Sequence, residues 1–252
     1  MKKIIVGNWK MNPQNISEAR NIFLKIRRKS GMLKRARAVI CPPIIFVGEL
    51  SRLSNRTCEI GAQDAFWADE GAYTGEISSE MLKECGATHV ILGHSEKRVL
   101  GDSDEIVNKK IRSVFDKRLL VVLCVGEKER DEDGHYLTLL KNQIRESLAK
   151  ISKKYFQSLI IAYEPVWAIG ANAKGVSTPD DYLEKAIYIR KILSQLSDKE
   201  TAMTIPILYG GSVDAKNASG FLREGRADGL LVGRASLDPI SFNSILSQTD
   251  AL

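Results

Sequence analysis

The sequence predicts an α/β fold, a single-domain (β/α)8 barrel in which eight parallel strands form a closed sheet over residues 1–252. Short apolar runs alternate with longer amphipathic segments along the whole chain. No linker, low-complexity block or change of composition divides it. The length of 252 residues also suits one barrel, because eight strand–helix units typically occupy about 250 residues.

Eight apolar runs of strand length are expected to form the sheet. They are residues 3–9, 37–42, 58–63, 88–93, 119–126, 158–164, 206–210 and 228–233. Several are apolar at every position, which is typical of parallel strands covered on both faces. An open, doubly wound sheet is the alternative, but no GxGxxG motif follows the first run.

Amphipathic segments between these runs are expected to be helices. The clearest are residues 17–29, 102–117, 136–155 and 178–196. The last begins with Thr178 as an N-cap, Pro179 at the first helical position and two acids close to the positive end of the helix dipole. Asp238 and Pro239 repeat this pattern before the final helix.

The composition predicts a cytoplasmic protein. The apolar runs are shorter than the roughly 20 residues that a membrane helix needs, and the N-terminus lacks the features of a signal peptide. The cysteines Cys41, Cys58, Cys85 and Cys124 are far apart in the sequence and are expected to be free thiols in a reducing compartment. The three histidines lack metal-ligand spacing, so no metal site is expected.

The formal net charge is +6, and basic residues concentrate in the acid-free run 25–37, "KIRRKSGMLKRAR". This run lacks interleaved aromatic residues and matches no nucleic-acid-binding motif. It is therefore expected to be a solvated face, and no nucleic-acid partner is expected.

Polar and charged residues follow the predicted strands where an active site should lie, because the site of such a barrel is built at the carboxyl ends of its strands. The candidates at six strand ends are Asn8 and Lys10; His94, Ser95 and Glu96; Cys124 and Glu127; Glu164; Tyr209 and Ser212; and Gly233 to Ser236. Taken singly, a glutamate or histidine at a strand end is usually structural or solvated. Their occurrence at several strand ends favours a catalytic site.

The candidate groups differ in kind and complement one another. A carboxylate can remove a proton from carbon, an imidazole can donate a hydrogen bond to an adjacent carbonyl, and an ammonium can stabilise the resulting negative charge. The glycine-rich ends of the last two strands expose backbone N–H groups, which suit a phosphate. The combination indicates proton abstraction next to the carbonyl of a small phosphorylated sugar.

Seven motifs closely resemble those of the triosephosphate isomerase family and occur in the family's order. They are "GNWKMN", "GAYTGEIS", "ILGHSEKR", "CVGE", "AYEPVWAIG", "YGGSV" and "LLVGRASL". The resemblance implies a TIM barrel that interconverts dihydroxyacetone phosphate and D-glyceraldehyde 3-phosphate through an enediol(ate), in glycolysis and gluconeogenesis. It also implies an intramolecular aldose–ketose isomerase that uses no cofactor.

The resemblance also assigns roles to individual residues. Glu164 resembles the base that moves a proton between two carbons, and His94 the neutral electrophile, for which this family is itself the standard example. Lys10 and Asn8 resemble the groups that contact the substrate oxygens, with Glu96 as an ionised partner of Lys10. The residues implied in substrate and phosphate binding are Asn8, Lys10, Gly170, Ser212, Gly233 and Arg234.

A loop after the sixth predicted strand resembles the family's lid, which would hold the substrate phosphate and exclude water. It comprises Pro165, Val166, Trp167, Ala168, Ile169, Gly170, Ala171, Asn172, Ala173 and Lys174. Tyr209 and Ser212 are the expected latch for this lid. The sequence "GANAK" differs from the family's common "GTGK", and Arg234 stands where a second glycine is common. Both differences are expected to affect rate and affinity and to leave the reaction class unchanged.

A long loop at residues 64–78 resembles the segment that inserts into a second subunit, with Thr74 directed at the partner's site. Its three aromatic residues suit burial at an interface. A homodimer is therefore expected. Two alternatives remain open: another phosphosugar-binding barrel isomerase or lyase, and a binding protein that uses the basic run 25–37.

Overall fold

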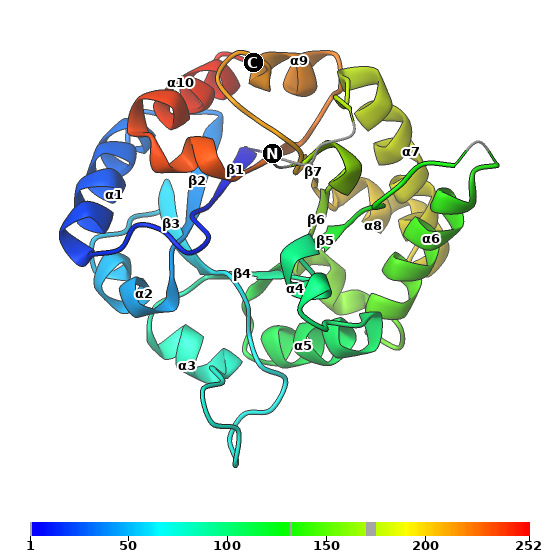
Figure 1. Cartoon of the computed structure of the whole chain (residues 1–252), viewed down its shortest axis with the longest axis horizontal. Helices are drawn as coiled ribbons and strands as arrows, with labels where there is room; N and C mark the ends of the chain where they lie inside the picture. The colour runs from blue at the N-terminus through cyan, green and yellow to red at the C-terminus, as the bar shows by residue number, and fades with distance from the viewer. Residues whose placement is uncertain (1, 132, 170–174) are drawn as a thin grey trace.

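The structure is a computed structural model that describes residues 2–131, 133–169 and 175–252. Its strands form a closed parallel barrel in chain order, with β8 pairing back onto β1 (Figure 1). The strands are β1 (Lys3–Asn8), β2 (Ala36–Cys41), β3 (Cys58–Ala62), β4 (His89–Leu92), β5 (Leu120–Val125), β6 (Leu159–Tyr163), β7 (Ile207–Tyr209) and β8 (Gly229–Val232). The predicted barrel is confirmed, and each strand ends a residue or so before its expected limit.

Helices surround the barrel (Figure 1). The α-helices are α1 (Ile16–Ser30), α2 (Ile44–Ser51), α3 (Ser79–Glu84), α4 (Ser95–Val99), α5 (Asp104–Asp116), α6 (His135–Ser147), α7 (Pro179–Leu196), α8 (Lys199–Thr204), α9 (Ala218–Arg223) and α10 (Pro239–Asp250). Short 3₁₀ turns are η1 (Lys153–Ser158), η2 (Val166–Ala168) and η3 (Arg234–Leu237).

The predicted helix starts at Thr178 and Asp238 are confirmed. Thr178 and Asp181 form a reciprocal capping box with Pro179 in the first turn. Asp238 accepts hydrogen bonds from the backbone N–H groups of Ile240 and Ser241. Each cap satisfies donors that have no partner within the helix, and so fixes where the chain leaves the carboxyl end of a strand.

The helix expected over residues 136–155 is wrong in its second half. The α6 helix ends at Ser147, Lys150 adopts a left-handed conformation with φ of 57°, and the chain resumes as η1. Asn108 of α5 donates to the carbonyls of Ser147 and Ala149, at 2.8 and 3.0 Å. A neighbouring helix thus satisfies the terminal carbonyls, which the amphipathic pattern alone could not reveal.

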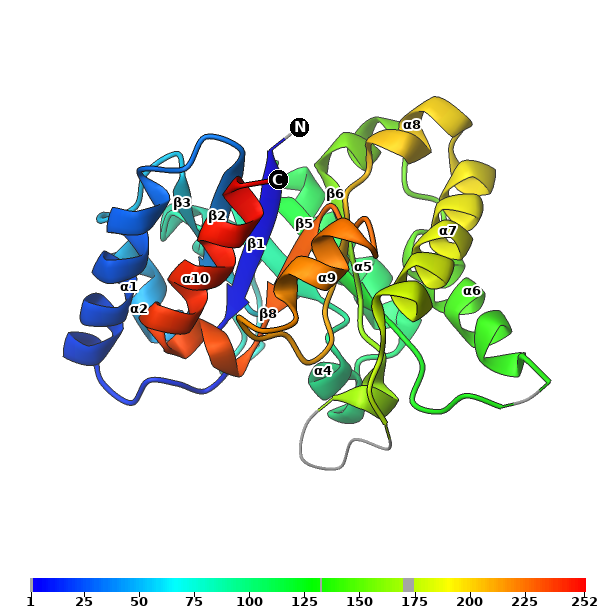
Figure 2. The same cartoon turned by 90° about the horizontal axis from the view of Figure 1, so that it is seen from above.

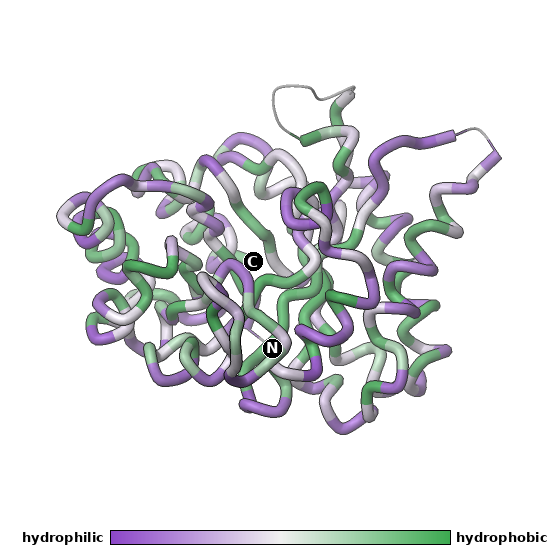
Figure 3. The backbone as a smooth tube through the Cα atoms, turned by 60° about the horizontal axis from the view of Figure 1, so that its bottom comes forward, coloured by the Kyte–Doolittle hydropathy of each residue, from purple (hydrophilic) through white to green (hydrophobic). Residues whose placement is uncertain are grey.

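Apolar side chains fill both sides of the barrel wall. The barrel interior holds Ile4, Val6, Val39, Cys41, Ile91, Val122, Cys124, Ile160, Ala162, Leu208 and Leu231. The alternate strand residues pack outward against the helices in a second, larger cluster. Figure 3 shows the hydrophobic strands at the centre and hydrophilic segments on the outer helices and loops. Burial on both faces explains why several strands lack hydrophobic alternation.

The two faces of the barrel carry different features. Figure 2 shows the arrowhead of β1, the helix α4 and the turn η2 on one face, while both chain termini lie on the other. The basic run 25–37 covers the last turns of α1, the connection to β2 and the first residues of β2, so its connecting loop lies on the face of the termini.

Within the described part of the chain, we find no helix with the length and apolar character required to span a bilayer.

Candidate active site

Glu164 directly follows β6 and is only 3% exposed. Its Oε2 accepts a hydrogen bond from the Ser95 backbone N–H at 2.9 Å, and its Oε1 lies 3.1 Å from His94 Nε2. Its own backbone N–H donates to the Val125 carbonyl at 2.8 Å. The carboxylate is therefore held between the ends of β4 and β5, pointing at the imidazole.

Two glycines make room for this arrangement. A Cβ at Gly126 would lie 1.7 Å from the Glu164 carbonyl oxygen, which is an impossible contact with main-chain atoms. A Cβ at Gly210 would lie 3.2 Å from Glu164 Cγ. Glycine is required at position 126, and favoured at 210, because the neighbouring chain passes so closely.

His94 is the N-cap residue of α4. Its Nδ1 accepts a hydrogen bond from the Glu96 backbone N–H at 3.2 Å, so this nitrogen carries no proton. The proton of a neutral ring must then be on Nε2, which donates to Glu164 Oε1. The local backbone thus selects a neutral imidazole whose N–H points into the site.

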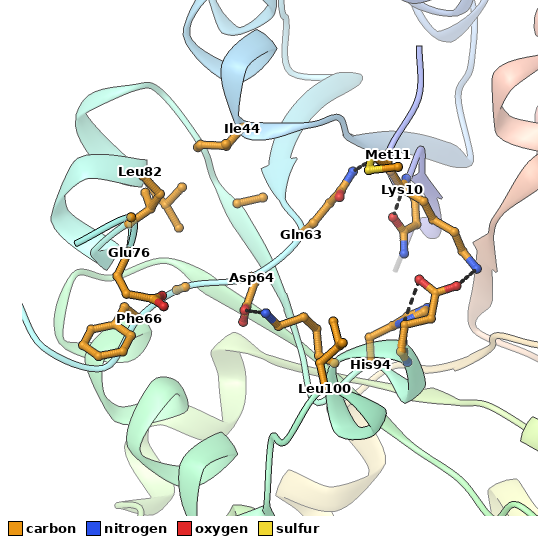
Figure 4. A pocket seen from close by; sticks show the side chains of 17 residues that line it. Lys10, Met11, Ile44, Gln63, Asp64, Phe66, Glu76, Leu82, His94 and Leu100 are labelled. Carbon is orange, nitrogen blue, oxygen red and sulfur yellow. Dashed lines mark hydrogen bonds and ion pairs between the residues drawn. The ribbon is translucent and has the colours of Figure 1, made fainter. Parts of the chain in front are cut away.

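Lys10 follows β1 in the left-handed region, with φ of 53°. Two side-chain amides hold its backbone: Asn8 Oδ1 accepts from the Lys10 N–H at 3.0 Å, and Gln63 Nε2 donates to the Lys10 carbonyl at 2.8 Å. Lys10 Nζ lies 2.5 Å from Glu96 Oε1, and Figure 4 shows this ion pair beside His94. This strained conformation aims the ammonium across the mouth of the barrel toward α4.

Cys124 lies in the barrel interior next to the carboxylate. Burial raises the pKa of its thiol well above the usual value, and the nearby charge of Glu164 raises it further. A thiol held in its neutral form is a poor nucleophile. Cys124 therefore packs against Glu164 rather than reacting with a substrate.

The structure describes Pro165–Ile169 of the expected lid, whereas Gly170, Ala171, Asn172, Ala173 and Lys174 lie outside the described residues. Trp167 Nε1 donates to Glu127 Oε1 at 3.0 Å, and the Arg130 guanidinium stacks 4.4 Å from the centre of the Trp167 ring. Ser212 Oγ donates to the Ala168 carbonyl at 3.0 Å. The first turn of this loop is thus fastened to the loops after β5 and β7.

The remaining expected residues lie around the same mouth. Tyr209 is buried and stacks on Phe221 at 3.6 Å between ring centres; burial raises the pKa of its phenol to about 12. Gly233 lies at the end of β8, where an added Cβ would be 3.8 Å from Lys10 Cε. Arg234 is exposed at the start of η3. Gly233 therefore lies close to Lys10, whereas the side chain of Tyr209 points outward from the barrel.

Sequence reasoning missed three polar residues that support this site: Gln63, Arg130 and Gln143. Gln63 and Gln143 bind main-chain atoms beside Lys10 and Glu164, and Arg130 contacts Trp167. Gln63 directly follows β3, so the strand-end criterion could have found it. The other two come from α6 and the loop before it, and only their three-dimensional placement reveals them.

A cavity of about 460 Å³ adjoins the site, between the loop 64–78 and α4. Figure 4 shows Lys10 and His94 on one side of it and Phe66 and Glu76 on the other. Thr74 is exposed on the loop, which projects away from the barrel between β3 and α3 (Figure 1).

The assembled groups can carry out proton transfer at carbon. A buried carboxylate, a neutral imidazole N–H and an ammonium face one opening, and backbone N–H groups lie at the ends of β7 and β8. This is the set required to remove a proton beside a carbonyl and to stabilise the oxyanion that forms.

Comparison with known proteins agrees with this chemistry. The family model for triosephosphate isomerase matches residues 3–249. The triosephosphate isomerase of Dictyoglomus thermophilum is 43% identical over 250 residues, covering 97% of this chain and 98% of that protein. Those of Moorella thermoacetica and Aquifex aeolicus are 41% and 39% identical, each covering 98% of this chain and, respectively, 98% and 99% of their own length. The chain belongs to the triosephosphate isomerase family.

Proposed function

We propose that Glu164, His94, Lys10 and Asn8 carry out the isomerisation of dihydroxyacetone phosphate to D-glyceraldehyde 3-phosphate and its reverse. The observation that carries the proposal is the 3.1 Å contact between Glu164 Oε1 and His94 Nε2. It places a base for carbon and a proton donor for oxygen side by side, so that both can reach neighbouring atoms of one substrate.

In the first step, Glu164 removes a proton from the hydroxymethyl carbon of dihydroxyacetone phosphate. The C–H electrons form a carbon–carbon double bond, and the carbonyl electrons move onto the oxygen. His94 Nε2–H donates to that oxygen, and the Lys10 ammonium stabilises the negative charge. Asn8 uses its carbonyl to accept from the Lys10 N–H, so its NH₂ group remains to donate to a substrate oxygen.

In the second step, the proton on Glu164 is delivered to the former carbonyl carbon. His94 moves the proton between the two oxygens, so that the oxygen of the first carbon becomes the aldehyde. No atom is gained or lost, and both residues return to their starting states. The reverse reaction uses the same groups.

The substrate phosphate is proposed to bind the backbone N–H groups of Gly170, Ser212, Gly233 and Arg234. Glycine at 233 permits close approach of a phosphate, and helical turns present N–H groups without partners. The lid over this site would exclude water and prevent loss of phosphate from the enediolate. Its described start is held by Trp167 and by the bond from Ser212 to Ala168.

The test is turnover of D-glyceraldehyde 3-phosphate by the purified protein in a coupled assay, beside Glu164→Asp. The shorter side chain retracts the carboxylate by one methylene, so kcat should fall roughly 100-fold or more while the protein stays folded. Negligible turnover by the folded wild type would overturn the proposal. Turnover that survives Glu164→Asp unchanged would instead show that another group is the base.

We also propose a homodimer in which the loop 64–78 enters the partner's cavity beside Lys10. Support comes from the apolar side chains around that cavity: Met11 is 83% exposed and Leu100 is 79% exposed. Clustered exposed apolar side chains mark interaction surfaces. The loop carries a matching aromatic group, in which Phe66 stacks on Trp67 at 3.9 Å between ring centres and meets Tyr73 in a tilted contact at 4.6 Å.

A cytoplasmic location is proposed on the basis of cysteine chemistry. The four cysteines are free, and Cys85 is exposed. An exposed free thiol is best preserved in a reducing compartment.

A further inference from the structure

Gln143, on α6, hydrogen-bonds the backbone of one residue at the edge of the site, Gly126. The Gly126 N–H donates to Gln143 Oε1 at 2.9 Å, and Gln143 Nε2 donates to the Gly126 carbonyl at 3.0 Å. One side-chain amide thus satisfies both main-chain groups of the residue that follows β5. In a sheet, a neighbouring strand would provide these two hydrogen bonds.

The missing neighbour is β4. Pairing between β4 and β5 stops at Leu92 and Leu123, so among the described residues no strand lies on that side of the chain beyond β5. On the other side, the Val125 carbonyl accepts from Glu164 N–H at 2.8 Å and the Glu127 carbonyl accepts from Val166 N–H at 3.0 Å. Gly126 lies between these two bonds and turns its own N–H and carbonyl toward α6.

Gly126 is also where the chain passes closest to the base. An added Cβ there would lie 1.7 Å from the Glu164 carbonyl oxygen. Val125 and Glu127, on either side of it, bind the backbone of Glu164 and of the first lid turn. A shift of Gly126 must therefore move the carboxylate, because the packing leaves no gap to absorb it.

We propose that Gln143 is a positioning residue for Glu164, an inference that rests on the proposed function. Gln143 lines a different cavity, of about 580 Å³, together with Tyr136, Leu139 and Val166. It acts on the base only through the main chain of Gly126. The helix α6 holds Gln143 rigidly, because the nearby side chains of Leu140 and Ile144 are fully buried.

The first test is Gln143→Met, which keeps the side-chain length and removes both hydrogen bonds. We expect kcat to fall roughly 10- to 100-fold with KM changed by less than about 3-fold, because the base is misplaced while phosphate binding is kept. The matched control is Gln248→Met. Gln248 likewise donates to a main-chain carbonyl, that of Ala215 at 2.8 Å, but it belongs to α10. This control should change Tm without changing kcat.

The second test is Gln143→Glu, which separates positioning from general stability. An ionised carboxylate would face the Gly126 carbonyl and repel it. A protonated carboxylic acid has one O–H donor and one carbonyl acceptor, so it restores both bonds. The ratio of variant to wild-type kcat should therefore rise several-fold as the pH falls from about 8 to about 5, since the facing Gly126 carbonyl disfavours the ionised form and raises the pKa of the introduced acid above its usual value near 4.3.

Three results would overturn the inference while leaving the proposed function intact. The first is a kcat of Gln143→Met within about 2-fold of wild type. The second is an equal loss of kcat in Gln143→Met and Gln248→Met. The third is a ratio of Gln143→Glu kcat to wild-type kcat that does not change with pH. If Gln143→Met does not fold, the pH dependence of the Gln143→Glu kcat ratio alone decides whether Gln143 positions Glu164. Absence of turnover in the wild type would overturn the proposed function and this inference together.

Discussion

Trp167 and Glu127 are joined by a hydrogen bond from the indole Nε1–H to Oε1, across 3.0 Å. The same carboxylate oxygen accepts from the Tyr163 hydroxyl at 2.7 Å and from Arg130 Nε at 3.1 Å. A single fully buried carboxylate therefore ties the turn η2, at the start of the proposed lid, to β6 and to the loop after β5.

Replacing Trp167 with phenylalanine should loosen that turn while keeping an aromatic ring under Arg130. A hydrogen bond to a charged group contributes about 1.5–3 kcal/mol, so kcat/KM should fall about 10-fold or more. The fraction of enediolate lost as methylglyoxal and inorganic phosphate should rise, because the proposed lid would protect this intermediate. Product analysis by NMR measures that fraction.

The matched control is Tyr155→Phe, which removes a hydroxyl that donates to Asp116 at 3.2 Å and keeps the stacking on Phe115. That pair lies away from the lid, on η1 and α5. Equal product fractions for Trp167→Phe and wild type would show that the indole hydrogen bond does not govern lid closure.

Replacing Gly126 with alanine should be far more damaging than the same change in a helix. The new Cβ would overlap the Glu164 carbonyl, so we expect kcat to fall roughly 100-fold or more. Gly48, inside α2, has only Cys85 Sγ nearby, at 3.9 Å from an added Cβ. Gly48→Ala should raise stability by about 0.5–1 kcal/mol without changing kcat. Similar kinetics in the two variants would contradict this account.

The fold was predictable because its signals are local. Apolar runs of strand length, caps such as Thr178 and the order of the elements all follow from neighbouring residues. The end of α6 was not, because it depends on Asn108 reaching across from another helix. A hydrogen bond from a distant side chain to the backbone at a helix end does not alter the hydrophobic periodicity of the sequence.

The candidate site was partly predictable for the same reason. Glu164, His94 and Lys10 end or follow strands, so the topology alone brings them to one mouth of the barrel. The residues that hold these three in place were not predicted from the sequence. Gln143 lies on the helix α6, and its helical spacing is that of any half-buried glutamine until β5 is seen to extend past β4.

His89 makes stability depend on pH. It is buried in β4, its Nδ1 lies 2.7 Å from Thr88 Oγ1, and its Nε2 is without a partner among the described residues. Burial, helped by the nearby charge of Arg37, lowers its pKa to about 3. Between about pH 6.5 and about pH 3 the unfolded chain binds a proton on His89 and the folded chain does not. The stability that neutral His89 contributes above about pH 6.5 is therefore lost as the pH falls toward about 3.

We expect this histidine to contribute a slope of about 1.4 kcal/mol per pH unit to the unfolding free energy between about pH 5.5 and about pH 4. Urea titrations of wild type and His89→Gln across that range measure it. The difference between the two proteins at about pH 8 gives the packing cost, because His89 is neutral there in both states. Parallel pH profiles for the two proteins would refute the assignment.

The proposed dimer predicts a specific defect for Thr74→Arg. The change would place a bulky guanidinium beside Lys10 in the partner's cavity, where steric overlap and loss of water from the charge should cost about 3 kcal/mol or more. The dimer dissociation constant should rise at least about 100-fold, as measured by sedimentation velocity over a concentration series. Thr138→Arg, at an exposed position of α6, is the control and should leave it unchanged. Two variants that sediment alike would argue against the loop 64–78 as the interface.

The carboxylate of Glu164 is held chiefly by main-chain atoms. The Ser95 N–H and the Val125 carbonyl owe little to any particular side chain, whereas the close approach of Gly126 depends on Gln143. Evolution can therefore exchange most surrounding side chains without displacing the carboxylate, provided that the barrel itself persists. The exceptions are Gln143, whose side chain holds Gly126, and the positions where a Cβ has no room, so substitution should be most restricted at Gln143 and at Gly126.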